Sequence, residues 1–218
     1  MRKTNQLLSV ALLISLGACS GDTEQSTVDD EYDLSLYQFH TNVLTNGGEI
    51  TITENYYSQS TGEGPVYAPT LRYLNVDGAI QRISVSGTVF EQSTITDTHI
   101  DKEGVSYTGF RRGDRFASIG DTYLDAEVEN LTLKQNCTLQ NHLESFDLGT
   151  ATGDHALASG VYEDVIQVYC VSVFTNADGS TRPNYDWNRY YAKGLGLISI
   201  DGRWPNFLTG DIYAIPQF

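Results

Sequence analysis

The chain has 218 residues, of which 40% are hydrophobic, and its formal net charge is −15. This length allows one domain with a substantial core. The acidic charge disfavours binding to nucleic acid or to anionic lipid headgroups, so no nucleic-acid partner is expected.

Residues 1–18 have the three parts of a secretory signal peptide. Arg2 and Lys3 form a basic start, the ten residues 7–16 an apolar centre, and Gly17-Ala18 a small-residue exit. Ten helical residues span about 15 Å, which is half of a ~30 Å hydrocarbon layer. A permanent transmembrane helix is therefore not predicted.

A cysteine follows this exit, and Leu16-Gly17-Ala18-Cys19 resembles the lipobox of bacterial lipoproteins. The resemblance implies that the Cys19 thiol is diacylglycerylated, that the chain is cut before it, and that the new amino group is acylated, with palmitate as an expected chain. Several acyl chains hold a protein on a membrane stably, whereas one does so only reversibly. Ser20 stands where lipoproteins kept in the inner membrane usually carry Asp. The resemblance thus implies attachment to the outer membrane, on its periplasmic or cell-surface face. The alternative is an ordinary signal cut beside a buried cysteine.

Residues 19–34 are rich in Gly, Ser, Thr, Asp and Glu, which predicts an acidic, flexible tether. The β-rich domain is expected over residues 35–218. Removal of the signal peptide takes away Arg2 and Lys3 but no acidic residue, so the net charge changes from −15 to −17. A solvated surface accounts for this charge, and an acidic surface that collects divalent cations is the alternative.

Turn signals and alternating apolar residues dominate the rest of the chain. Asp77-Gly78 predicts a hairpin turn between residues 71–76 and 79–90, and Gly113-Asp114 predicts another turn. Further strands are expected at 49–53, 105–110, 115–119, 121–134, 137–143, 185–193, 194–200 and 207–215.

Residues 162–175 are apolar on both faces, which is typical of a strand in the middle of a covered sheet. No segment after Cys19 shows a sustained helical period. The sequence therefore predicts an all-β fold: a single antiparallel β-sandwich or a curved, partly closed barrel.

Cys137 and Cys170 are the two cysteines that remain after Cys19. An even pair in an exported chain predicts a disulfide. A metal-binding or catalytic thiol is the alternative, but neither cysteine lies in a CxxC motif.

The segments 162–168 and 190–198 resemble the C-terminal signature of many uncharacterised bacterial envelope lipoproteins. This resemblance implies a β-rich envelope domain and supplies no catalytic residues. The residue types in these segments are also consistent with a β-rich domain, because Gly194 and Gly196 permit a bulge or a close approach of two strands.

Familiar catalytic spacings such as HExxH, GxSxG and SxxK are absent from the sequence. Each histidine is expected to be a surface or satisfied polar residue: His40, His99, His142 and His155. Asp125, Glu127 and Glu129 would share one strand face, and Asn176, Asp178 and Ser180 resemble the start of a calcium loop without its distal Glu. No catalytic residue, metal or cofactor is predicted, and calcium binding stays a minor alternative.

The chain is rich in tyrosine, with 14 residues of this type. Aromatic side chains are good strand formers, but a group of them could also form a surface that stacks on sugars or on a protein partner. The candidates for such a surface are Tyr185, Trp187, Tyr190, Tyr191 and Trp204.

The sequence is typical of a membrane-attached envelope protein whose molecular activity it does not specify. The first hypothesis is a non-enzymatic module, anchored through Cys19, that binds or scaffolds an envelope protein or glycan. The second is a carrier that holds a hydrophobic or lipid ligand in a curved β-sheet. The third is an envelope hydrolase, which would need a histidine, an acid and a nucleophile to converge.

Overall fold

Residues at positive φ form the tight turns that divide the chain into strands. Asp77 (φ 52°) and Gly78 (φ 87°) form the two-residue hairpin turn that the sequence predicts. Gly87 (φ 90°) lies in a second turn, which breaks the single strand expected over residues 79–90 into two. Gly113-Asp114 is not a turn, because both residues pair with the neighbouring strand.

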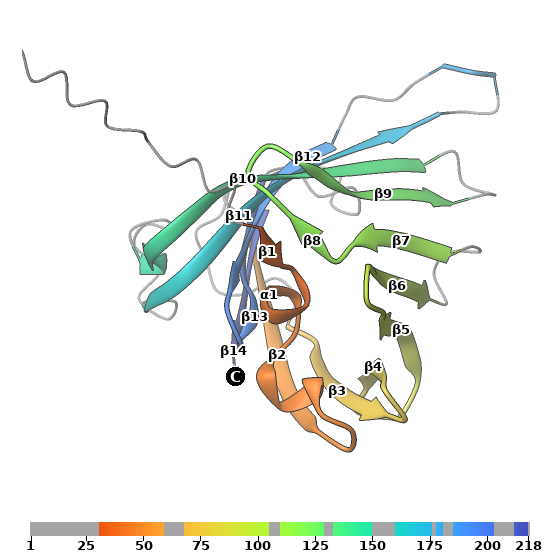
Figure 1. Cartoon of the computed structure of the whole chain (residues 1–218), viewed down its shortest axis with the longest axis vertical. Coiled ribbons are helices and arrows are strands. Elements are labelled where there is room, and N and C mark those ends of the chain that lie inside the picture. The colour runs from red at the N-terminus through yellow and green to blue at the C-terminus, as the bar shows by residue number, and fades with distance from the viewer. Residues whose placement is uncertain are drawn as a thin grey trace, which may run out of the picture.

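The computed structural model describes residues 31–58, 68–104, 110–128, 133–149, 160–175, 178–180, 185–202 and 212–217. Figure 1 shows that strands make up nearly all of this structure. The elements in chain order are β1 (Tyr32–Asp33), α1 (Ser35–Gln38), η1 (Thr41–Leu44), β2 (Glu49–Ser58), β3 (Thr70–Val76), β4 (Ala79–Ser84), β5 (Val89–Ile95), β6 (His99–Gly104), β7 (Phe110–Asp114), β8 (Phe116–Ala117), β9 (Thr122–Val128), β10 (Leu133–Asp147), β11 (Val161–Phe174), β12 (Tyr185–Ala192), β13 (Gly196–Gly202) and β14 (Ile212–Gln217).

Twelve of the described strands pair in one ring, in the order β10-β11-β12-β13-β14-β2-β3-β4-β5-β6-β7-β9 and back to β10. Every pairing is antiparallel. The join between β7 and β9 is short, with two residue pairs, Arg112↔Asp125 and Gly113↔Leu124. These pairings confirm the predicted all-β, antiparallel fold class. They also confirm that residues 162–175 form a central strand, since β11 pairs with β10 and β12.

The strands curve around the N-terminal segment, which we call the plug and define as residues 32–44 (Figure 1). Four plug side chains are buried in the interior of the ring: Leu34, Tyr37, Phe39 and Val43. They pack with the inward-facing side chains of the strands, among which are Ile80, Ile100, Cys137, Leu139, Ile166, Val168, Cys170, Trp187, Tyr191 and Ile200. The interior next to the plug is therefore filled by the chain's own side chains.

The position of the plug corrects the predicted tether boundary at residue 34. Tyr32 and Asp33 pair with Ala117 and Phe116 in β8, and Leu34 is fully buried. Residues 20–34 have a low apolar content, so nothing in the sequence indicated that Leu34, at the end of that range, is buried. Within the described residues, neither α1 nor η1 has the length and apolar character of a membrane-crossing helix.

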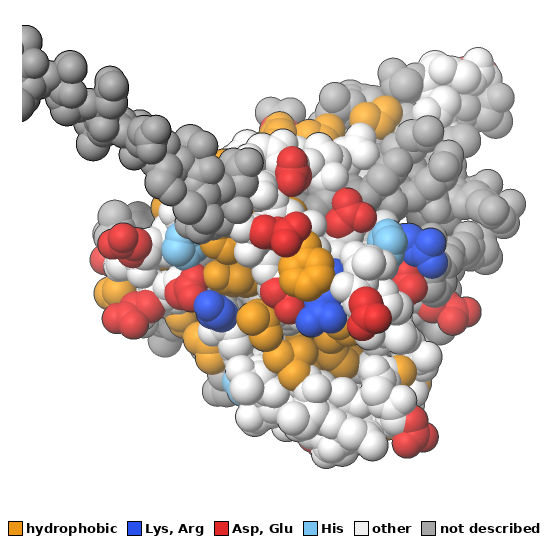
Figure 2. Space-filling view, in the orientation of Figure 1, with side chains coloured by type: hydrophobic (Ala, Val, Ile, Leu, Met, Phe, Trp, Pro, Cys, Tyr) orange, Lys and Arg blue, Asp and Glu red, His pale blue; other side chains and the backbone are white. Residues whose placement is uncertain are grey.

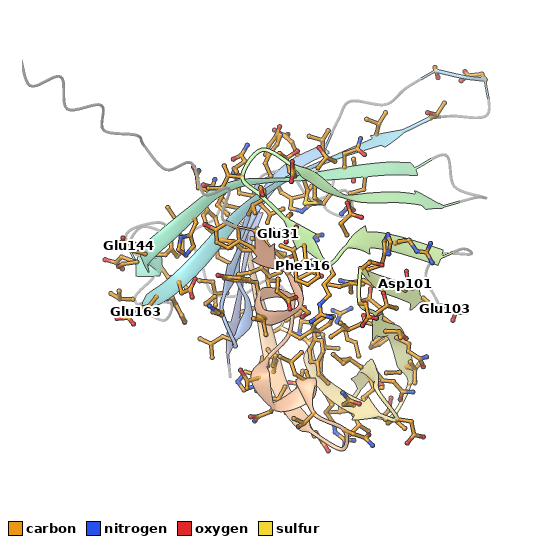
Figure 3. The ribbon with its side chains drawn as sticks, viewed as in Figure 1. Glu31, Asp101, Glu103, Phe116, Glu144 and Glu163 are labelled. Carbon is orange, nitrogen blue, oxygen red and sulfur yellow. A yellow bond between two sulfur atoms is a disulfide. The ribbon has the colours of Figure 1, made fainter. Side chains whose placement is uncertain are left out.

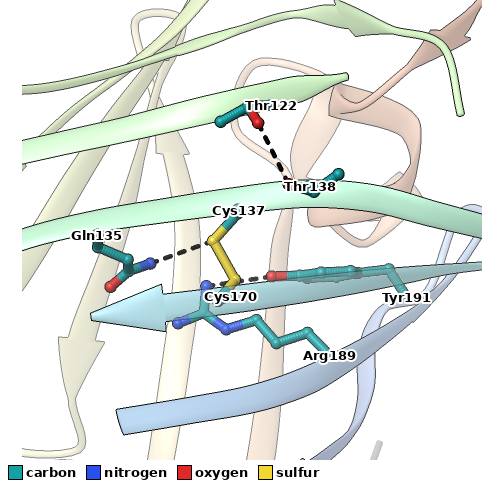
Figure 4. Close-up of a disulfide and its surroundings, with 7 residues drawn as sticks. All are labelled: Thr122, Gln135, Cys137, Thr138, Cys170, Arg189 and Tyr191. Atoms are coloured by element: carbon teal, nitrogen blue, oxygen red, sulfur yellow. Dashed lines mark hydrogen bonds between the residues drawn. A yellow bond between two sulfur atoms is a disulfide. The ribbon is translucent and has the colours of Figure 1, made fainter. Parts of the chain in front are cut away.

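The predicted disulfide is present in the wall of the ring. Cys137 and Cys170 lie directly opposite each other on β10 and β11, and both are fully buried (Figure 4). Trp187 of β12 is the next residue in the same cross-strand row. The bridge therefore joins two neighbouring strands inside the main core.

Strand direction gives the ring two distinct ends. The plug lies at the end where β3, β5, β7 and β12 finish, and we call this the plugged end. Its contacts there include backbone hydrogen bonds between Thr41 and Gly194 (2.8 Å) and between Leu34 and Arg115 (2.7 Å). The opposite, far end is where β2, β4, β6, β9, β11 and β13 finish.

Candidate functional site

An ion pair fixes the start of the plug. The Arg115 guanidinium donates from Nε to Asp33 Oδ1 (3.1 Å) and from Nη2 to Asp33 Oδ2 (2.8 Å). Two parallel bonds of this kind restrict geometry more than a single contact does. Arg115 Nη1 also donates to the Thr96 carbonyl oxygen (3.0 Å), so one side chain ties the plug to the turn after β5.

A second polar cluster holds the middle of the plug, and we call it the latch: Tyr37, His142, Asp164 and Lys193. The Tyr37 hydroxyl donates to Asp164 Oδ1 (2.6 Å), and His142 Nε2 lies 2.8 Å from the same oxygen. Lys193 Nζ lies 3.0 Å from Asp164 Oδ2. One carboxylate thus joins α1, β10, β11 and the turn after β12.

The backbone at Asp164 adopts a left-handed conformation, with φ of 51°. A non-glycine residue with positive φ is uncommon, although Asp tolerates it better than most residues. The surrounding contacts over-determine this conformation, because the Asp164 carbonyl oxygen also accepts a hydrogen bond from the Lys193 amide (3.0 Å). The local backbone therefore points the carboxylate toward the plug.

The latch changes the acidity of its own members. Burial raises the pKa of the Tyr37 phenol, and the hydrogen bond that it donates to the Asp164 carboxylate raises it further. Partial burial alone would raise the pKa of Asp164, but hydrogen bonds from Tyr37, His142 and Lys193 lower it overall. The pKa of Asp33 is lowered in the same way: burial opposes the shift, and hydrogen bonds from Arg115 and Ser35 produce it. Both carboxylates are therefore charged at neutral pH.

The latch contains a histidine hydrogen-bonded to a carboxylate, an arrangement that hydrolases also use, but its described contacts include no nucleophile. An imidazole hydrogen-bonded to a carboxylate can act as a general base when a nucleophile lies within reach. The described partners of His142 are Asp164 and the ring of Tyr32, at 5.1 Å between centroids. Neither is a Ser, Thr or Cys nucleophile, so the described geometry fits a structural latch.

A small cavity of about 40 Å³ lies between the plug and the strands. Its polar lining includes His40, Glu54 and Tyr73, and Tyr73 Oη donates to Glu54 Oε1 (3.3 Å). Arg82 Nη2 lies 3.3 Å from the other Glu54 oxygen. Burial lowers the pKa of His40, so that side chain is neutral at pH 7. A cavity of this size holds one or two water molecules, far from the several hundred Å³ of a typical ligand site.

The described aromatic side chains among those predicted to form one surface do not share a face. Trp187 and Tyr191 are 5% and 7% exposed and belong to the interior core, so the prediction is wrong for them. Tyr190 lies on the outer face, where its ring stacks on Phe146 with centroids 4.4 Å apart. Successive strand residues point to opposite faces, which separates Tyr190 from Tyr191. The side chain of Tyr185 and all of Trp204 lie outside the described residues.

The other candidate residues are dispersed. His99 lies 3.6 Å from Asp114, and Asp178 accepts hydrogen bonds from Ser180 within its own turn. Cys19, His155 and Asn176 lie outside the described residues, as do Glu129 and the side chains of Asp125 and Glu127. Within the part of the chain that the structure describes, no group of three or more His, Cys, Asp or Glu side chains is arranged to hold a metal ion.

The latch was missed by the sequence interpretation. The sequence singles out His142 only as one of four histidines, and Tyr37 and Asp164 are 127 residues apart in the chain. No local spacing relates such residues. The positive φ of Asp164 also has no sequence signal, because the residue stands within a strongly β-forming segment.

Comparison with solved structures gives two low-identity matches. A protein from Bacteroides fragilis, described as exported and with a YmcC-like fold, is 10% identical, with a TM-score of 0.44 over 83% of this chain and 97% of that chain. A protein from Parabacteroides distasonis, described as a lipoprotein, is 9% identical, with a TM-score of 0.37 over 82% of this chain and 97% of that chain. No protein-family model matches the sequence, and neither does any curated protein.

Proposed function

We propose that this chain is a lipoprotein of the outer membrane, anchored through Cys19, whose barrel is a non-enzymatic module that binds or scaffolds another envelope component. The lipobox Leu16-Gly17-Ala18-Cys19 supports the anchor. Partner classes that suit the outer surface are an envelope protein and a glycan.

The main support for this proposal is that the plug occupies the plugged end of the ring. Leu34, Tyr37, Phe39 and Val43 fill the space that a carrier would offer to its ligand. The cavity beside them that is lined by described residues, at about 40 Å³, is too small for an acyl chain. Recognition at the plugged end therefore uses the outside of the molecule.

The plug also connects the proposed anchor to the fold without a long spacer. Glu31 is twelve residues after Cys19, and the next residues pair with β8. Twelve residues of flexible chain have a root-mean-square length of about 20 Å. The domain would thus work close to the membrane surface, which suits a scaffold more than a diffusing carrier.

The anchor is tested by intact mass and membrane fractionation of the native protein and of Cys19→Ala. We expect the native mass to include a diacylglyceryl group and an acyl chain, and the variant to leave the membrane fraction. A native product without lipid would overturn the anchor.

The module is tested by photo-crosslinking in cells. A photoreactive residue is placed at exposed Val85 or Val161, and buried Leu139 is the matched control. We expect a discrete adduct from an exposed position and none from Leu139. Solvent extraction of the purified protein followed by lipid mass spectrometry tests the alternative: a stoichiometric lipid beyond the anchor would favour the carrier.

A further inference from the structure

Three exposed apolar side chains lie on elements at the plugged end. Leu36 of α1, Phe116 of β8 and Ile119 in the following turn are 37%, 38% and 55% exposed. We call these three residues the plug-end patch. Figure 2 shows hydrophobic side chains in the middle of this face with acidic side chains around them, and Figure 3 places Phe116 near its centre.

The Phe116 ring is held in place rather than free to fold back. Arg115 lies against it, with the guanidinium carbon 5.1 Å from the ring centroid. Arg115 is itself fixed by Asp33 and by the Thr96 carbonyl. Phe116 also pairs through its backbone with Asp33 of the plug. The exposed aromatic side chain is thus presented on a rigid base, which reduces the entropy lost on docking.

The described chain begins beside this patch. Tyr32 pairs with Ala117, so Glu31 leaves the fold next to β8, and Figure 3 shows Glu31 close to Phe116. Twelve residues of random coil would have a root-mean-square length of about 20 Å, which is about half the width of roughly 40 Å of a domain of this size. A chain anchored at Cys19 would therefore hold the plugged end, on average, nearer to the bilayer than the far end.

We propose that the plug-end patch rests on the surface of the bilayer that holds the acyl chains of Cys19. This inference rests on the proposed lipid anchor. Phe and Leu side chains are suited to the boundary between headgroups and acyl chains. The patch is small, so it orients an anchored protein and does not bind an unanchored one.

The charges around the patch select the kind of lipid. Glu31, Asp97, Asp114 and Asp121 are exposed at this end. The basic side chains here, Arg115 and Lys193, are already paired with Asp33 and Asp164. An excess of acidic over basic side chains at this end repels anionic headgroups, so the surface that fits is zwitterionic.

The experiment uses the native lipoprotein reconstituted into vesicles of phosphatidylcholine and phosphatidylethanolamine. Phe116→Cys and Val85→Cys each receive one polarity-sensitive fluorophore, since Cys137 and Cys170 are bonded to each other and Cys19 carries the lipid. Val85 is 69% exposed and lies after β4 at the far end, so it is the matched control. We expect a blue shift and quenching by brominated acyl chains at position 116 and no change at position 85.

A longer tether distinguishes docking from simple proximity. Insertion of twenty Gly and Ser residues after position 24 raises the root-mean-square reach to about 30 Å. A docked patch retains the blue shift at position 116, and loss of the shift would overturn the proposal. Ile119→Ser should reduce the shift while Val85→Ser leaves it unchanged. Anionic lipid should also reduce it, and 1 M salt should restore it because charges are then screened within about 3 Å.

The two proposals fail in different ways. A protein that floats with the vesicles but gives equal spectra at positions 116 and 85 overturns the docking and leaves the anchor intact. A protein whose mass lacks the lipid and that does not float overturns the anchor, and the docking inference falls with it.

Discussion

The strands of the ring, which we call the wall, and the plugged end, which we call the mouth, are stabilised by different interactions. In the wall, β10, β11 and β12 align Cys137, Cys170 and Trp187 in one row, and a disulfide joins the first two. In the mouth, the plug is held by hydrogen bonds to two carboxylates, Asp33 and Asp164. The wall therefore contains a covalent bond that does not titrate, whereas the mouth depends on groups that lose their charge in acid.

This comparison shows how an irregular segment can be as deeply buried as a regular strand. Leu34 in the plug and Leu139 in β10 are both 0% exposed. The strand residue pairs with Val168 of β11, and on its other side it forms backbone hydrogen bonds with Gly120 and Asp121. The plug residue donates one backbone hydrogen bond to the Arg115 carbonyl oxygen, and its own carbonyl oxygen accepts from the Tyr37 and Gln38 amides. Substitutions in each region can therefore test whether the wall and the plug unfold together.

The largest expected effect comes from removing the disulfide in the wall. The bridge spans 33 residues, and chain entropy alone predicts a loss of about 4 kcal/mol in the free energy of unfolding. Urea unfolding of the double variant Cys137→Ala, Cys170→Ala measures this loss. Reductant should destabilise the native protein and leave the double variant unchanged. A loss below about 1 kcal/mol would mean that the denatured chain is already compact.

The matched leucines test whether the plug belongs to the same cooperative unit. Leu139→Ala and Leu34→Ala each remove a fully buried side chain, and each should cost about 3 kcal/mol in urea unfolding. Leu36→Ala on the exposed side of α1 is the control, with a cost near 0.5 kcal/mol or less. If Leu34→Ala costs nothing while Leu139→Ala costs the full amount, the plug detaches before the wall unfolds.

Substitutions at Asp164 separate backbone conformation from charge. Asp164→Ala removes the hydrogen bonds and places a residue without a polar side chain at φ 51°, so we expect a loss of about 2 kcal/mol. Asn tolerates positive φ, and its side-chain oxygen can still accept the hydrogen bond from Tyr37. Asp164→Asn should therefore lower the free energy of unfolding by about 1 kcal/mol. Thermal unfolding provides the comparison, and Glu163→Ala, an exposed neighbour, is the control. Equal losses for Ala and Asn would exclude the contribution of backbone conformation.

Acid should weaken the mouth before the wall. The pKa values of Asp33 and Asp164 are lowered in the folded state, so the stability they contribute is complete above about pH 4. It is lost as the pH falls through their lowered pKa values. Urea midpoints at pH 6 and pH 3 should therefore differ more for the native protein than for Asp33→Asn. The same pH dependence in both proteins would show that the Arg115 pair contributes nothing.

Much of the strand pattern could be predicted, because alternation is a property of neighbouring residues. The hairpin at Asp77-Gly78 was predicted correctly since that turn needs positive φ at both residues. The Gly113-Asp114 turn was wrong because the same residue types also occur within a strand, where they pair with Ile100 and His99. Gly and Asp permit a turn but do not require one.

The candidate site could be predicted only in part. Cys137 and Cys170 could be paired by elimination. The latch could not, because Tyr37, His142 and Asp164 come from three separate elements, α1, β10 and β11. The predicted aromatic surface is wrong for Trp187 and Tyr191 for a simpler reason. Residues close together in a strand point alternately to its two faces, so Tyr190 and Tyr191 lie on opposite faces.

The sequence by itself determined that this chain forms antiparallel strands, that its two late cysteines join, and that its surface is acidic. These properties follow from side-chain period, composition and charge, which need no knowledge of distant contacts. Tertiary structure alone decided which face of each strand turns inward and that residues 32–44 enter the mouth of the ring. Closure of the ring sets both outcomes, because it fixes which remote residues meet and how much space remains for the plug.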